Sequence, residues 1–377
     1  MLSHNILQVF HLFENNGFEI RIVGGAVRDF LLNKKPKDFD FCTTATPSQM
    51  IEIAKKNNIN VIPTGILHGT VTFHIGNDFF EITTLRVDKK CDGRHAVIEF
   101  TSSFEEDARR RDLTINAMMM DKHGTIFDWF GGQDDINSEV IRFVGDSEER
   151  IKEDFLRILR FFRFASKFEK NTVTFDRKGK EAICNNINGL RNISSERIWA
   201  ELSKILTSNS FPIILNELEN CGIFNVLEIS IIRKDLAIKV QQKNGTAAQI
   251  LSALVATSDN DVEHFSKKLK LSNIENIEAL WFFRNIIKPQ TIDDAKVFLV
   301  NGISFQWVKT LFDVIDDKDT IDFILNWEIP KFPVSGNDLI EKRIKLGPAM
   351  GVILCNLRTK WISSNFSLSK EELLTDI

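Results

Sequence analysis

The stretch Arg21–Phe41, "RIVGGAVRDFLLNKKPKDFDF", combines an apolar segment, a double glycine, an arginine and two aspartates separated by one phenylalanine. Residues two apart on a strand face the same side, so we expect Asp38 and Asp40 to project together while Phe39 points into the core. Like charges held this close repel unless a cation lies between them, and hard oxygen ligands suit magnesium. An isolated DxD is more often a solvated strand end, so its neighbours decide between these interpretations.

The neighbouring residues favour a phosphate site. Gly24 and Gly25 follow a predicted strand and open a short helix, which lets backbone N–H groups approach a phosphate closely. Arg28, one turn into that helix, adds a fixed cation. Glu81, in "FEITTLR", is expected on a further strand, where it is a third metal ligand, a base for a hydroxyl nucleophile or a paired surface glutamate. Together these residues predict a metal–phosphate site.

Hydrophobic periodicity divides the chain into two parts. The first third alternates strands with helices, and from Ser147 onward helical periodicity replaces strand signals almost completely. The fold class is therefore expected to be α+β, with an all-helical remainder. The glycine-bearing "DWFGGQDDINSEVIRFVGD" places the first boundary near Asn137. We predict strands at residues 21–23, 39–41, 70–74 and 79–85, and helices at residues 26–32 and 48–56.

Composition bounds the class of protein. A chain of 377 residues exceeds the usual single core, and 43% hydrophobic with 27% charged residues is typical of a globular protein. The sequence contains no apolar run long enough for a bilayer and no signal-peptide pattern near its start, so we expect a cytoplasmic protein without membrane contact. Five scattered cysteines indicate reduced thiols. The net charge of −4 means that any nucleic-acid affinity depends on local basic clusters.

One such cluster lies in "RIKEDFLRILRFFRF" (Arg150–Phe164), which is expected to be a single helix that is apolar on nearly all sides. Asp154 and Arg157, three residues apart, are close enough on a helix to hold one another or to present a flat acceptor–donor edge. Such an edge would recognise cytosine and adenine alike. An ordinary salt bridge within the helix is the alternative.

A second cluster lies in "RRRDLTINAM" (Arg109–Met118). Arg111 and Asp112 form another arginine–acid pair, suited to a triphosphate and a ribose hydroxyl, and Asn116 follows one turn later. Asp112 as the cap of a helix is an equally good interpretation.

These motifs, in this order, resemble those of class II tRNA nucleotidyltransferases, the CCA-adding enzymes, in the polymerase-beta-like superfamily that also contains bacterial poly(A) polymerases. The resemblance covers most of the chain. It rests on "GGAVRDFLLNKKPKDFDF", "FEITTLRVDKKCDGRHAVIEF", "RRDLTINAM", "FDWFGGQDDI", "EDFLRILRFFRF" and "ISSERIWAEL".

The resemblance implies a role for each matching position. It implies two Mg²⁺ ions on Asp38 and Asp40, with Glu81 as a further catalytic candidate. The implied nucleotide-binding residues are Gly24, Gly25 and Arg28 for the triphosphate, Arg111, Asp112 and Asn116 for phosphates and ribose, and Glu153, Asp154 and Arg157 as the template that selects CTP and then ATP, supported by Arg160 and Arg163.

The resemblance also implies how the chain is organised. We expect a head with a small mixed sheet, followed by helical neck, body and tail domains that cradle the acceptor arm of tRNA, in a monomer or weak dimer. The expected bounds are residues 1–137 for the head, 138–203 for the neck, 204–275 for the body and 276–377 for the tail.

Three other activities share features of this pattern. A poly(A) polymerase has the same head motifs, a CC-adding enzyme differs in the loop that "RVDKKCDGRHAVIEF" represents here, and an A-adding enzyme is a further alternative. A binding protein without catalysis would have no need of Asp38 and Asp40. The chain departs from the family in having 31 phenylalanines and no tyrosine. Phe39, Phe155 and Phe161 stand where relatives often have tyrosine, which keeps the packing and removes the hydroxyl hydrogen bonds.

Overall fold

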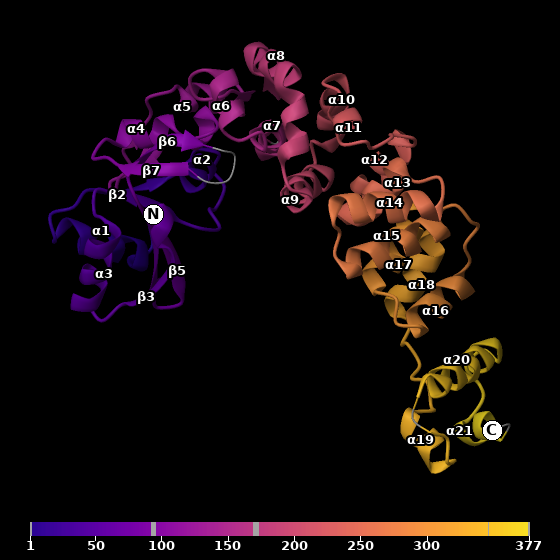
Figure 1. The fold of residues 1–377 in the computed structure, drawn as a ribbon. Helices are drawn as coiled ribbons and strands as arrows, with labels where there is room; N and C mark the ends of the chain where they lie inside the picture. Colours follow the sequence, from indigo (N-terminus) through magenta and orange to yellow (C-terminus); the bar gives the residue numbers. More distant parts are fainter. Residues whose placement is uncertain (1, 92–95, 169–172, 346, 376–377) are drawn as a thin grey trace. The chain divides into compact units, whose positions relative to one another are not determined.

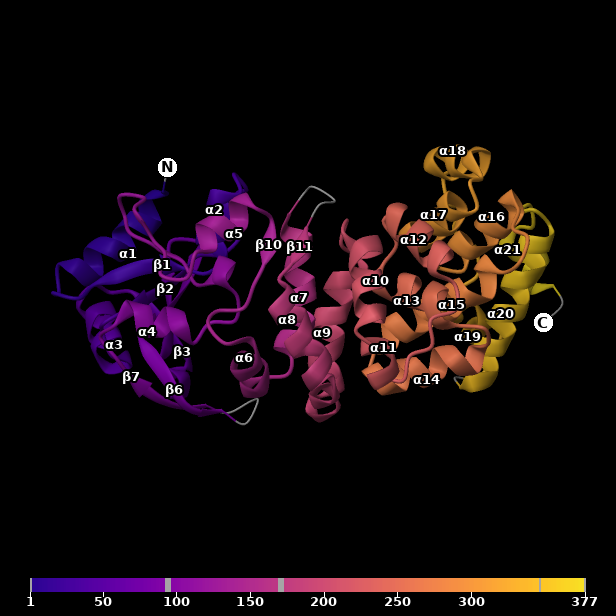
Figure 2. The same ribbon diagram turned by 90° about the horizontal axis from the view of Figure 1, so that it is seen from above.

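The computed structural model describes residues 2–91, 96–168, 173–345 and 347–375. The chain divides into two compact units, and each is described by itself (Figures 1 and 2). The predicted division into head, neck, body and tail stays a prediction. Unit 1 comprises residues 1–231 and 265–271, and unit 2 comprises residues 232–264 and 272–377.

A seven-stranded sheet forms the first part of unit 1, in the order β3-β4-β5-β2-β1-β8-β9. β2 and β5 run parallel and the other neighbours run antiparallel, so the sheet is mixed, as predicted. The predicted strands at residues 21–23, 70–74 and 79–85 correspond to β1, β4 and β5. The strands are β1 (Ile20–Val23), β2 (Asp40–Thr43), β3 (Asn60–Gly65), β4 (Thr70–Ile75), β5 (Asp78–Thr84), β8 (Met119–Met120) and β9 (Ile126–Phe127).

The two faces of the sheet differ because side chains alternate along each strand. The strand register puts Phe41 and Phe73 on one face, where both are completely buried. Helix α1 (His4–Glu14) covers this face, and the ring of its Phe10 packs edge-on against Phe41 with the centroids 5.6 Å apart. The opposite face therefore carries Asp40.

Helices and a hairpin surround the sheet. On the face of Asp40, a smaller apolar core joins Val23 and Cys42 to Phe104. Helix α3 begins at Pro47 because Thr46 and Gln49 form a reciprocal capping box. The elements are α2 (Gly25–Leu31), α3 (Pro47–Lys56), α4 (Phe104–Arg109), and the antiparallel hairpin of β6 (Arg86–Cys91) and β7 (Ala96–Phe100).

The single helix predicted over Arg150–Phe164 is wrong, because the chain forms two helices there. α6 (Ser147–Glu153) ends at Asp154, whose backbone is extended with φ −155° and ψ 105°. The Asp154 carboxylate accepts a hydrogen bond from the backbone N–H of Leu156 at 3.1 Å, which stabilises the break before α7 (Arg157–Phe164). Local hydrogen bonding thus overrides the apolar periodicity.

The rest of unit 1 is helical except for one short strand pair. β10 (Val140–Ile141) pairs in parallel with β11 (Thr174–Phe175), so strand structure reaches further along the chain than predicted. The helices are α5 (Gly132–Asn137), α8 (Arg177–Asn186), α9 (Ser195–Leu206), α10 (Phe211–Asn220) and α11 (Ile223–Val226).

Unit 2 is helical throughout its described residues, as predicted for the remainder of the chain. Trp361, Leu339 and Val334 lie in the core of its last part, against which Phe332 and Phe366 pack. Its helices are α12 (Lys234–Gln242), α13 (Ala247–Val255), α15 (Asn273–Ile286), α16 (Ile292–Val300), α17 (Phe305–Val314), α18 (Lys318–Asn326), α19 (Gly336–Glu341), α20 (Pro348–Ser363) and α21 (Lys370–Leu374), and α14 (Asp259–Leu269) extends from unit 2 into the segment of residues 265–271.

Candidate active site

The acidic residues gather where β1 ends and β2 begins. Asp40 pairs with Val23 on one side and with Glu81 on the other, so the Asp40 and Glu81 side chains leave the same face of the sheet. Burial raises the pKa of Asp40, and the negative charges of Glu81 and Asp38 raise it further, whereas Arg111 lowers it. Several carboxylates therefore compete for one region in which a divalent cation would relieve their repulsion.

The described residues contain no group of three or more histidine, cysteine, aspartate or glutamate side chains able to hold a metal ion. Magnesium binds proteins through one or two carboxylates and completes its octahedron with water and substrate phosphates, so a magnesium site would need a smaller set of side chains than this. Asp38 and Asp40 stay the predicted metal ligands, and the negative charge of Glu81 near Asp40 is what a bound cation would offset.

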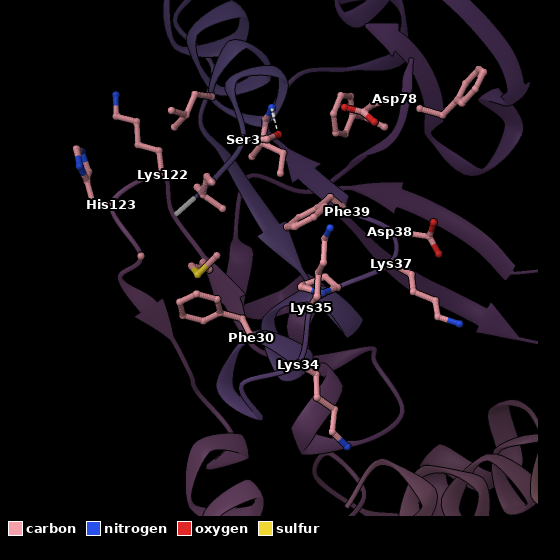
Figure 3. A pocket seen from close by; sticks show the side chains of 18 of the residues that line it. Ser3, Phe30, Lys34, Lys35, Lys37, Asp38, Phe39, Asp78, Lys122 and His123 are labelled. Carbon is pink, nitrogen blue, oxygen red and sulfur yellow. Dashed lines mark hydrogen bonds between the residues drawn. The ribbon is translucent and has the colours of Figure 1, made fainter. Parts of the chain in front are cut away.

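A pocket of about 1110 Å³ opens beside Asp38 (Figure 3). Phe39 lines this pocket and is half-buried, so the prediction that Phe39 points into the core is wrong. The reason is that β2 begins at Asp40, and Asp38 and Phe39 belong to the loop before it. Lys34, Lys35, Lys37 and Lys122 also line the pocket.

The double glycine forms the tight turn between β1 and α2. Gly24 has φ 66° and ψ −121°, a conformation that only glycine adopts readily. Arg28 is 4% exposed, and its guanidinium donates to the Asn116 side-chain oxygen at 2.6 Å and pairs with Asp29 at 2.6 Å. The structure therefore brings together Gly24, Arg28 and Asn116, which the sequence assigned to one site.

Arg111 and Asp112 are adjacent in the sequence but pair with different neighbours, and their roles toward the triphosphate and the ribose stay predictions. Arg111 pairs with Asp107, one turn earlier, at 3.0 Å. Asp112 pairs with Arg160 of α7 at 2.6 Å and accepts a hydrogen bond from Asn116 at 3.2 Å. Adjacent residues point to different neighbours here because Arg111 follows α4 while Asp112 begins an extended segment that pairs with residues 142–144.

Asp112 belongs to a buried charged network. Burial alone would raise its pKa, but the Arg160 guanidinium reverses this and holds the pKa of Asp112 below its ordinary value. Arg163 pairs with Glu201 of α9 at 2.6 Å, and Arg160 lies 3.9 Å from the same carboxylate. These contacts attach α7 to the residues that follow α4 and to α9.

Asp154 and Arg157 do not hold one another, so the alternative of an ordinary salt bridge between them is wrong, while their role toward a base stays a prediction. Asp154 forms an ion pair with Arg197 of α9 at 2.7 Å. Arg157 forms one with Glu153 at 2.5 Å, and its guanidinium also donates to the Arg110 carbonyl oxygen at 3.0 Å. The break at Asp154 separates the two side chains that a continuous helix would have placed together.

Three charged residues of this region, namely Asp107, Arg197 and Glu201, lie outside the set of residues predicted from the sequence. Asp107 precedes Arg111 by four residues, a spacing that brings side chains together on a helix. Arg197 and Glu201 have the same spacing within "ISSERIWAEL". These spacings were available signals, but the partners of Arg197 and Glu201 lie far away in the sequence.

The mixed sheet, the acidic strand ends and the helical remainder define the class of a nucleotidyltransferase head followed by helical domains. A family model described as the poly A polymerase head domain matches residues 20–142. A second model, described as the probable RNA and SrmB-binding site of polymerase A, matches residues 173–230.

Known proteins narrow this class. The mitochondrial CCA tRNA nucleotidyltransferase 1 of Danio rerio is 35% identical over 392 residues, which cover 100% of this chain and 91% of that protein. The human protein of the same name is 36% identical over 393 residues (100% and 90% covered), and the CCA-adding enzyme of Lactobacillus helveticus is 31% identical over 390 residues (97% and 94% covered). The chain belongs to the family of CCA tRNA nucleotidyltransferases.

Solved structures show the same fold. The Bacillus stearothermophilus CCA-adding enzyme, crystallised with CTP, superposes with a TM-score of 0.71 at 25% identity, covering 97% of this chain and 94% of that one. The Thermotoga maritima CCA-adding enzyme with tRNA superposes with a TM-score of 0.64 at 20% identity, covering 100% and 95%. Within the described residues of our chain, every helix is too short or too polar to cross a membrane.

Proposed function

We propose that this chain adds C, C and A to the 3′ end of tRNA without a nucleic-acid template, using CTP and ATP and releasing pyrophosphate. The observation that carries the proposal is the identity of 35–36% across the whole chain with proteins named for this reaction. The gathering of Asp40, Glu81 and Asp38 at one edge of the sheet supports it, because nucleotidyl transfer needs a concentrated negative site for cations.

Asp38 and Asp40 would hold two magnesium ions, which when bound activate the 3′-hydroxyl of tRNA and stabilise the departing pyrophosphate. Glu81 faces the same region, since it lies opposite Asp40 on the parallel strand β5. The Glu81 carboxylate would either add a ligand oxygen or accept the proton of the 3′-hydroxyl.

The triphosphate would lie at the turn of Gly24 and Gly25. A Cβ atom on Gly24 would come within 3.2 Å of the Arg111 Nη1 atom, so glycine leaves space between the turn and a cation. Arg28 adds a second guanidinium, held in place by Asn116. We assign the ribose to Asp112, whose carboxylate accepts a hydrogen bond from the Asn116 side chain at 3.2 Å.

Base selection would use Asp154 and Arg157, with Glu153 beside them and Arg160 and Arg163 as support. A carboxylate accepts from an exocyclic amine and a guanidinium donates to ring acceptors, so the pair suits cytosine and adenine. In this structure both side chains are occupied by Arg197 and Glu153. Reading a base therefore requires an exchange of these ion pairs for contacts with the nucleotide.

The proposal is tested with a tRNA transcript that ends at the discriminator base, incubated with magnesium and with CTP and ATP separately and together. Sequencing of the 3′ ends is expected to show CCA. Long A tails from ATP alone would identify a poly(A) polymerase, and products ending in CC would identify a CC-adding enzyme. Addition of a single A only to transcripts ending in CC would identify an A-adding enzyme. No extension would favour a binding protein.

Two variants relate the activity to the site. Asp40→Asn removes one negative charge from the proposed metal site and is expected to abolish incorporation. Asp293→Asn is the control, because the Asp293 side chain is 78% exposed on α16 of unit 2, where it pairs with Lys296 at 2.8 Å. Equal activity of the two variants would contradict the assignment of Asp40.

The predicted cytoplasmic location and the predicted monomer or weak dimer stay predictions.

A further inference from the structure

Asp107 of α4 is a fully buried carboxylate that accepts hydrogen bonds from two guanidinium groups and one backbone N–H. Its Oδ1 atom accepts hydrogen bonds from Arg110 Nε at 2.9 Å and from the backbone N–H of Arg86 at 3.3 Å. Its Oδ2 atom accepts one from Arg111 Nη2 at 3.0 Å. Burial would raise the pKa of Asp107, but Arg111 and Arg110 hold it below its ordinary value, so the group is a charged acceptor.

The contact with Asp107 fixes which end of Arg111 is available. Nη2 is engaged by Asp107, whereas Nη1 lies against the Gly24 turn, 3.2 Å from the position of a Cβ atom there. Asp107 therefore orients the guanidinium that lies against the Gly24 turn.

The same carboxylate holds the root of the β6–β7 hairpin. Arg86 is the first residue of β6, and its backbone N–H has Asp107 as acceptor. The Arg110 carbonyl oxygen in turn accepts from Arg157, at the start of α7. The Asp107 carboxylate thus connects Arg86, at the start of the hairpin, with Arg111, at the Gly24 turn. Its other partner, Arg110, contacts α7, the helix proposed to select the base.

We propose that Asp107 is a positioning residue that holds Arg111 toward the nucleotide triphosphate and couples this orientation to the root of the β6–β7 hairpin. Asp107 contacts no substrate itself. The inference rests on the proposed function only in naming the triphosphate, because the contacts among Asp107, Arg111 and Arg86 are independent of the reaction.

Asp107→Asn separates this role from simple filling of the core. Asparagine has nearly the same volume, but its amide nitrogen is a donor and faces groups that are also donors. At least one of the three partners then loses its acceptor. If Asp107 positions Arg111, the KM for CTP and for ATP rises about tenfold or more while kcat changes less. A purely structural role lowers thermal stability and leaves both KM values unchanged at temperatures where the variant is folded.

Glu105→Gln is the matched control. Glu105 lies on the same helix and pairs with Arg109 at 2.8 Å, but both side chains are largely exposed. Its loss is expected to leave both KM values within twofold of wild type. The double variant of Asp107→Asn with Arg111→Lys completes a cycle, in which the KM is expected to be no more than about threefold above the worse single variant.

The second measurement compares the amide hydrogen exchange rates of the wild type and of Arg111→Lys without nucleotide. This comparison requires neither a folded Asp107→Asn variant nor catalytic activity. Weakening one partner of Asp107 should loosen the others, so the amides of residues 86–88 are expected to exchange at least threefold faster. Unchanged exchange there, or KM values for Asp107→Asn within twofold of wild type, would overturn the inference. A wild type that extends no RNA would instead contradict the proposed function, and the exchange result would still decide the positioning role.

Discussion

Replacing Gly24 with alanine tests whether the β1–α2 turn shapes the nucleotide site. Gly24 has φ 66° and ψ −121°, which an L-residue adopts only under strain of about 1–3 kcal/mol. The new Cβ atom would also lie 3.2 Å from Arg111 Nη1 and 3.6 Å from the Asn116 carbonyl oxygen. The variant therefore combines a loss of stability with displacement of a cation at the site.

The size of the catalytic effect follows from the contact that is lost. A hydrogen bond to a charged group contributes about 1.5–3 kcal/mol. If Arg111 moves away from the triphosphate, kcat/KM for CTP should fall about 10- to 150-fold, since about 1.4 kcal/mol corresponds to a factor of ten. The assay is steady-state incorporation into a tRNA transcript, with thermal unfolding measured on the same preparation.

Gly222→Ala controls for backbone strain. Gly222 also has a positive φ of 73°, and the nearest atom to a Cβ placed there, Asn225 Nδ2, is 4.0 Å away. This variant should lose about 1–2 kcal/mol of stability and keep its kcat/KM. If Gly24→Ala retains kcat/KM within twofold of Gly222→Ala, the steric argument about Arg111 is refuted.

Three further changes test other parts of the chain. Arg197→Ala removes the ion-pair partner of Asp154. Misincorporation of UTP and GTP, counted by sequencing, should then rise severalfold, while the free energy of unfolding falls by less than about 1 kcal/mol. Unchanged fidelity would exclude a role for this ion pair in base selection. Gly189→Ala places a Cβ atom 2.0 Å from the Phe155 ring, so it should lower the free energy of unfolding by about 1–3 kcal/mol. The displaced ring should also alter the preference for CTP over ATP. An unaltered preference would show that Phe155 does not influence Asp154. Burial raises the pKa of Glu278 to about 7, well above the ordinary 4.5, so the folded state loses stability as the pH rises from about 4.5 through 7. Glu278→Gln should therefore match the wild type at pH 4 and be more stable by up to about 3 kcal/mol at pH 8.5 in denaturant unfolding, whereas equal stability at pH 8.5 would show that the carboxylate is not destabilised by burial.

The head sheet was predictable because its central strands alternate apolar and polar residues. β1, β4 and β5 lie within one residue of their predicted ends. The start of β2 was not predictable, because Phe39 has the sequence pattern of a strand residue but lines the pocket beside Asp38. β3 was missed because it contains Pro63 and Gly65, which weaken the strand pattern.

The candidate site was predictable by residue but not by partner. Gly24, Arg28 and Asn116 lie together and Glu81 lies opposite Asp40, while the roles assigned to them stay predictions. The pairing of Asp112 with Arg160, 48 residues later, depends on how α7 packs, and no local spacing encodes it. Asp107 was the exception, because its spacing of four residues from Arg111 could have been read on a helix.

The break at Asp154 has a consequence for how a base would be selected. On a continuous helix, Asp154 and Arg157 would neutralise one another, and a nucleotide would have to separate them. In the structure, Asp154 pairs with Arg197 and Arg157 pairs with Glu153, and each would give up one half-buried ion pair to bind a base. Only a base that satisfies both side chains at once can offset both losses. If this pair selects the base, the occupied side chains would favour selectivity, because a base with the wrong donors and acceptors would leave at least one half-buried charge without a partner.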